Sequence, residues 1–384
     1  MNHSLIPPQA GALALLLFTL TAGAVTPPDG GVTGLQGLAQ GQATTPIAIA
    51  RPGTDADAAI APLLAAGPLS ADTAVRIALL NNPGLQVSLA SEGVNVSDAV
   101  AAGNPAKRQA SQDITLLSAQ VRKAWTRAVA AAQIARHFAG AKESAEAGGE
   151  LARRMARTGN WSRLQQAREQ LLLADAAAQL ARAQQAAFSE REKLIVAMGL
   201  WGAKTGFQLP DRLPDLPAQP QELPDVESRV LQQRLDLQLA NAQWARQRAA
   251  KRDPGADALW DAMRDAARVR ELAVKARSEA REAYHGYRTA YDLARHYQAE
   301  VLPLYQFVND ETLLRYNGML ASVFELLAEA RAQAQAAGSA VEAQRDFWLA
   351  DADLQTVLAG APLEAASGTA SGTSAQRASG AAAH

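Results

Sequence analysis

Apolar residues separated by alternating steps of three and four constrain this chain more than any other feature of its sequence. One such stripe runs through residues 114–138 and another through residues 273–301. This spacing places the apolar side chains along one side of an α-helix, so that two helices can pack along their lengths. Most stripe positions are Ala, which lets the backbones approach closely. The spacing therefore predicts an all-α chain of long antiparallel coiled-coil helices.

Two short turns separate these long helices and predict the tips of helical hairpins. The first turn covers residues 157–162 (Arg-Thr-Gly-Asn-Trp-Ser), and the second covers residues 315–322. Beyond the first turn we expect an apolar stripe to fold back on the preceding helix through Leu164, Ala167, Leu171, Ala174, Ala178 and Ala181. Two hairpins of this kind on one chain indicate an internal duplication.

Changes in composition divide the chain into two helical repeats with irregular flanks. An apolar run followed by small residues predicts a signal peptide over residues 1–24, and a Pro/Gly-rich leader follows over 25–68. The first repeat spans 69–209, with Ser70 or Asp72 as its N-cap and a helix break at Pro83. A Pro-rich connection covers 210–224, the second repeat spans 225–361, and we expect a disordered tail over 362–384.

Charge and residue usage argue against several classes of function. Lys plus Arg (37) and Asp plus Glu (38) nearly cancel, so no basic surface predicts nucleic-acid binding. The sequence contains no cysteine, no phosphate-binding Gly loop and no nucleophile elbow. His137, His285 and His296 have no second His or Cys at helical spacing, so we interpret them as packed or surface histidines. We therefore expect no enzyme activity, no metal site and no cofactor.

The order of the elements resembles that of the TolC-like outer-membrane efflux factor family. The local matches are residues 74–83 (AVRIALLNNP) and 314–318 (LRYNG), and residues 345–355 resemble the metal- and copper-resistance branch. The resemblance extends over roughly residues 69–360, within which the two repeats follow each other. It implies a homotrimer that forms a periplasmic helical tunnel. It also implies a periplasmic adaptor as partner and, through the adaptor, an inner-membrane pump.

Two short connections distinguish the chain from that family, in which each repeat inserts two membrane strands. Here residues 103–110 and 251–256 stand in those places as polar turns. Two strands and a loop need about 20 residues. We therefore expect a TolC-like helical barrel without the membrane β-barrel. An exported chain of this kind would lie in the periplasm, or at the outer membrane if the resemblance extends to location.

The hairpin tips are the functional sites that the resemblance implies. They would contact the adaptor through Gly159, Asn160, Trp161, Ser162, Gly318, Met319, Leu320 and Ser322, with entrance charge from Arg153, Arg154, Arg157 and Arg163. Exposed Trp161, Met319 and Leu320 favour a protein partner, because a solvated turn has no need of large apolar side chains. The two glycines are equally well explained by the left-handed residue that commonly ends a helix.

Two functions remain open at this stage. The first is an outer-membrane-factor-like subunit of a tripartite efflux system, which conducts substrates passed on by an adaptor and a pump. The alternative is a barrel-less periplasmic helical scaffold or interaction protein, natural or engineered, that does not conduct. Only the conduit requires a closed ring, so the oligomeric state distinguishes the two.

Overall fold

The computed structural model describes residues 56–91, 105–250 and 256–363, and within these ranges every regular element is a helix. The predicted all-α fold is therefore confirmed. The predicted signal peptide, most of the leader and nearly all of the tail lie outside the described residues, as does the expected turn at 251–255. Among the described helices, none combines the length and the apolar character that a membrane crossing demands.

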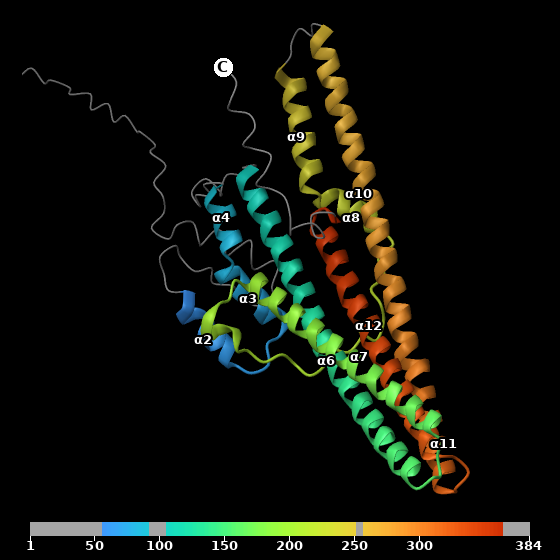
Figure 1. Ribbon diagram of the computed structural model, residues 1–384. Coiled ribbons are helices and arrows are strands. Elements are labelled where there is room, and N and C mark those ends of the chain that lie inside the picture. Colours follow the sequence, from blue (N-terminus) through green and yellow to red (C-terminus); the bar gives the residue numbers. More distant parts are fainter. Residues whose placement is uncertain (1–55, 92–104, 251–255, 364–384) are drawn as a thin grey trace, which may run out of the picture.

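Two long helical hairpins form the body of the molecule, and their tips meet at one end (Figure 1). The first hairpin consists of α6 (Pro105–Arg157) and α7 (Arg163–Met198), as predicted for the first repeat. In the second, α10 (Ala256–His296), the π turn η2 (Tyr297–Val301) and α11 (Leu302–Asn317) form one arm, and α12 (Val323–Leu358) returns. The shorter elements are α2 (Ala56–Ala65), α3 (Ala71–Asn81), α4 (Pro83–Ser91), η1 (Gly202–Thr205), α8 (Val226–Gln233) and α9 (Leu235–Ala250).

The long helices pack in the lateral order α7, α6, α12 and then α10 with α11. Helices α6 and α12 lie in the middle, and each contacts a helix on both sides. Helices α7 and α11 therefore form the two edges of the layer. Side-chain contacts near the tips also join α7 to α12.

The predicted apolar stripes are confirmed on α6 and α10 and wrong on α7. Ile114, Val121 and Ala128 of α6 are fully buried, and so are Ala276 and Ala280 of α10. On α7 the six predicted positions are all exposed instead. The inward side of α7 is a second 3–4 stripe, in which all five members are buried or half-buried: Leu173, Ala176, Leu180, Ala183 and Ala187.

The helix boundaries follow local signals closely in the first repeat. Ser70 caps α3 by accepting a hydrogen bond from the Thr73 N–H, and the chain breaks at Asn82 before Pro83, as predicted. Helix α6 begins at Pro105, so the expectation of a turn over 103–110 is wrong from that residue onward. Proline is well suited to the first position of a helix, where its missing N–H is not needed.

In the second long arm the structure has a π turn just before Pro303. The Leu302 N–H donates to the Tyr297 carbonyl oxygen, five residues back. Since Pro303 has no N–H to donate, a widened turn accommodates it while the helix continues into α11.

The breaks that precede the two hairpins have nearly the same geometry. Asn82 has φ −67° and ψ 115°, and Arg234 has φ −62° and ψ 112°. After each break a glutamine side chain donates to a carbonyl oxygen six residues earlier, from Gln86 to Leu80 and from Gln238 to Gln232. A similar local conformation therefore arises twice on this chain from different residues.

Left-handed glycines end both returning helices and pack against these breaks. Gly199 has φ 68° and Gly360 has φ 87°. A Cβ atom on Gly199 would lie 2.7 Å from the Asn81 carbonyl oxygen, and one on Gly360 would lie 2.2 Å from that of Gln233. Both positions thus require glycine for its conformation and for its lack of a side chain.

One apolar core surrounds the start of each hairpin. The first core includes α2, where Ile60 is fully buried and where Leu63 and Leu64 pack against the same cluster. The last part of the predicted leader is therefore a packed helix, because apolar contacts with α3 stabilise a segment whose own sequence carries no helical periodicity. In the second core Arg234 is buried and pairs with Glu279 and Asp236.

Candidate functional site

The first tip is closed by hydrogen bonds that end α6 and begin α7. The Asn160 N–H donates to the Met155 carbonyl oxygen at 3.0 Å, and Gly159 between them has φ 78°. This is the usual end of a helix with a left-handed residue. Ser162 then caps α7 and forms a reciprocal capping box with Gln165.

The second tip repeats this geometry, but its left-handed residue is Met319 and not Gly318. The Leu320 N–H donates to the Arg315 carbonyl oxygen at 2.7 Å, and Ser322 accepts a hydrogen bond from the Glu325 N–H. Met319 has φ 58°, whereas Gly318 has φ −80°. The assumption that Gly318 supplies the left-handed conformation is thus wrong by one residue. A non-glycine residue in this conformation stores roughly 1–3 kcal/mol of strain.

The apolar side chains of the two tips differ in exposure. Met319 is 94% exposed and Leu320 is 80% exposed. Trp161 is only half-buried rather than exposed, because its ring stacks on Phe324 at a centroid distance of 4.1 Å. This stacking connects the first tip to the start of α12. Phe324 was not among the predicted site residues, and no local signal in the sequence pairs it with Trp161.

The four tip arginines fall into two pairs. Arg153 and Arg154 both donate to the Glu150 carboxylate, at 2.8 and 2.9 Å. These hydrogen bonds lower the pKa of Glu150. Arg157 and Arg163 lie on exposed positions at either side of the turn. Of the predicted entrance charges, Arg157 and Arg163 are therefore better placed to face a partner than the two arginines engaged by Glu150.

Both edges of the helical layer carry apolar side chains in water. On α7 these are Leu164 and Leu171, which are 63% and 70% exposed. On α11 they are Leu304, Phe307 and Leu314, which are 62%, 65% and 66% exposed. Spacings of three and seven residues place each set along one side of its helix. Sequence reasoning found the α7 stripe but assigned it to the hairpin interior.

No ligand set for a metal is present in the part of the chain that the structure describes, where no group of three or more His, Cys, Asp or Glu is suitably placed. The features that stand out are two capped tips and two apolar edges. Together with the paired long hairpins they define an all-α protein of two helical hairpins that lie side by side.

Comparisons with solved structures agree with this fold. The chain is similar to a structure of CusC from a study of transmembrane channel formation (TM-score 0.58, 14% identity, covering 77% of this chain and 99% of that one). It is also similar to the outer-membrane channel OprN (TM-score 0.57, 14% identity, covering 78% of this chain and 90% of that one). The third similar structure is the Campylobacter jejuni outer membrane channel CmeC, with a TM-score of 0.55 and 13% identity; the match covers 72% of this chain and 68% of that one.

At these low identities the structural likeness shows the fold alone, and activity has to be argued from the chain itself. No protein-family model matches the chain, and no curated protein matches it. The TolC-like fold predicted from the order of elements is confirmed.

Proposed function

We propose that this chain is an outer-membrane-factor-like subunit of a tripartite efflux system. In this proposal three copies form a helical tunnel whose tips dock on a periplasmic adaptor, and an inner-membrane pump supplies the substrate. The observation that carries the proposal is the second tip, where Met319 and Leu320 are exposed and Met319 is held in a strained conformation. Strain of this kind clusters at functional sites.

The adaptor contact follows from the chemistry of the tips. Two adjacent apolar side chains, almost fully in water, bury apolar surface only when a partner covers them. Exposed Arg157 and Arg163 surround the other tip and favour a partner with acidic groups at its rim. The glycine, Asn160 and serine residues of the tips shape the turns, so we assign them a positioning role.

Assembly into a ring follows from the two apolar edges. An edge of α7 and an edge of α11 are different surfaces, so pairing them joins copies head to tail. A head-to-tail contact closes into a ring when its rotation allows. We propose three copies, as the resemblance to the TolC-like family implies, and each closed contact would cover Leu171 and Phe307.

Export, location and origin complete the proposal. An N-terminal signal peptide would deliver the chain to the periplasm, where the ring lies alone or at the outer membrane. The similar breaks at Asn82 and Arg234, together with the two similarly closed tips, support an internal duplication.

The experiment that tests the proposal places a photo-crosslinking amino acid at residue 319 in the native organism, with residue 201 as control. Trp201 is 77% exposed but lies away from both tips. We expect residue 319 alone to capture a periplasmic adaptor, identified by mass spectrometry. Capture at both positions, or at neither, contradicts specific docking at the tip.

The scaffold alternative is tested by transport in the same strain. If the chain conducts, its deletion raises the cellular accumulation of pump substrates, and the wild-type gene restores efflux. Adaptor capture without any change in accumulation would support the non-conducting scaffold instead.

A further inference from the structure

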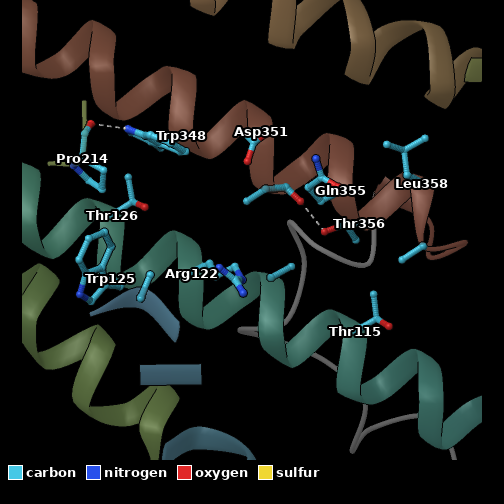
Figure 2. Close-up of a pocket in the computed structure, with 14 residues that line it drawn as sticks. Thr115, Arg122, Trp125, Thr126, Pro214, Trp348, Asp351, Gln355, Thr356 and Leu358 are labelled. Atoms are coloured by element: carbon cyan, nitrogen blue, oxygen red, sulfur yellow. Dashed lines mark hydrogen bonds between the residues drawn. The ribbon is translucent and has the colours of Figure 1, made fainter. Parts of the chain in front are cut away.

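A cavity of about 630 Å³ lies between α6 and α12, away from the tips and from the two edges (Figure 2). This volume is within the range of small-molecule sites, roughly 300–1,000 Å³. Ala71 of α3 and Pro214 of the connection complete its walls. Neither the adaptor contact nor the ring contact proposed above makes use of it.

Two tryptophans form fixed apolar walls of this cavity. The Trp348 Nε1–H donates to the Pro214 carbonyl oxygen at 3.0 Å, and the Trp125 Nε1–H donates to the Leu69 carbonyl oxygen at 2.7 Å. Trp125 is almost completely buried. Trp125 therefore has little surface left for a ligand, whereas the half-buried Trp348, whose indole nitrogen already has a partner, can offer its apolar and π-electron surface.

The charged groups at the cavity favour a positive ligand. Asp351 projects from α12 toward α6, and Arg122 lies across from it on α6 (Figure 2). Arg122 pairs with Asp72 at 2.7 Å. In the described part of the chain Asp351 has no ion-pair partner within 4.0 Å; it bonds the Gln355 side chain. With Arg122 engaged by Asp72, Asp351 is the charged group of the lining that has no ion pair within the described residues.

The surroundings of Asp351 disfavour its ionised form. Burial raises its pKa, while the hydrogen bond with Gln355 and the charge of Arg122 oppose this increase. From α10, the phenol of Tyr287 interacts electrostatically with Asp351. A bound cation would supply the opposite charge that the carboxylate lacks and would favour its ionised form.

We infer that the α6–α12 cavity binds a small organic cation with a flat apolar body. The positive charge lies beside Asp351, and the body lies against Trp348. Aromatic faces attract cations, and Trp does so most strongly among the aromatic residues. The inference is independent of the proposed function, since it requires no adaptor, no ring and no conduction.

The test uses the purified full chain and three probes of similar size but different charge. These are benzyltrimethylammonium, benzyl alcohol and phenylmethanesulfonate, each titrated by calorimetry at neutral pH. We expect the cation to bind most tightly and the sulfonate least. Asp351→Asn should weaken the cation about tenfold, equivalent to about 1.4 kcal/mol, and leave benzyl alcohol unchanged.

Two further measurements separate this site from general loss of structure. Glu329→Gln removes a carboxylate from the same helix outside the cavity and should leave binding unchanged. Trp348→Phe should weaken the cation while retaining a ring, and circular dichroism checks that each variant is folded. Binding of the cation should also weaken as the pH falls through the raised pKa of Asp351.

The inference is overturned by any of four results. The first three are equal binding of the three probes, preference for the sulfonate, and cation binding that survives Asp351→Asn in a folded protein. The fourth is absence of binding by all three probes at millimolar concentration. None of these results bears on adaptor capture at the tip, so the two proposals fail separately.

Discussion

Leu171 offers the most direct test of ring assembly, through the substitution Leu171→Ser. The side chain is 70% exposed in the single chain, and a neighbouring copy would cover it. Burying a whole Leu side chain stabilises by roughly 1.5–3 kcal/mol, so burying this exposed portion contributes roughly 1–2 kcal/mol. A closed trimer contains three such contacts, which together contribute roughly 3–6 kcal/mol. The variant should therefore weaken assembly by about 10²–10⁴-fold.

The assay is mass photometry or sedimentation velocity over a range of protein concentrations. The stability of the isolated chain should change by less than about 0.5 kcal/mol, because Leu171 lies on its surface. Trp201→Ser is the matched control, since Trp201 is 77% exposed but lies outside the α7 stripe. If the wild-type chain is monomeric at micromolar concentration, or if Leu171→Ser and Trp201→Ser assemble alike, the reasoning about the edges is refuted.

Five further substitutions test local features. Gly360→Ala should destabilise the chain by about 3 kcal/mol or more in urea melts, because the new Cβ clashes with the backbone and φ is left-handed. Gly67→Ala is the control: φ is positive there too but the space is open, so the substitution should cost only about 1 kcal/mol. Met319→Gly should release about 1 kcal/mol of strain and slow hydrogen exchange at the second tip, yet weaken adaptor capture. Gly159→Ala should destabilise the first tip by about 1 kcal/mol, because Gly159 has a left-handed φ. Folding raises the pKa of Asp351, so its ionisation destabilises the folded chain as the pH rises above 3.8, the pKa of the unfolded state. Asp351→Asn should therefore stabilise the chain at pH 7. The same substitution should have little effect below pH 3.8, as measured by melts of both proteins at each pH.

Helix positions and ends could be predicted from residues close in sequence. The 3–4 spacing of Ile114, Val121 and Ala128 predicted the buried side of α6. Ser70 and Pro83 marked a helix start and a helix break, because capping and the missing proline N–H act over a few residues. The hairpin tips were located for the same reason, since a helix end needs a left-handed residue followed by a cap.

The buried side of α7 could not be predicted from periodicity. This helix has two apolar stripes, one through Leu173 and Ala176 and one through Leu164 and Leu171, and both have helical spacing. Only the position of α6 and α12 decides which stripe is covered. The other stripe stays exposed, so the misassigned residues are the ones that support the proposed assembly.

At the tips, too, some features were predictable from the sequence and others depended on the fold. The sequence located both turns, but the fold decided that Trp161 stacks on Phe324 and that Met319, not the adjacent glycine, has the left-handed conformation. Trp161 and Phe324 lie far apart along the chain, and no local signal relates them.

The sequence by itself determined that this chain forms long helices, where they break and how they are capped, because periodicity and capping depend on neighbours within a few residues. The tertiary structure decided which apolar stripes are buried, how the two tips meet, and that Trp125, Trp348 and Asp351 surround one cavity. These outcomes depend on contacts between helices distant in sequence, where the same Ala- and Leu-rich stripe packs equally well on several neighbours. Local sequence preferences therefore determined where the helices form, and packing between the helices determined which of their surfaces stay exposed.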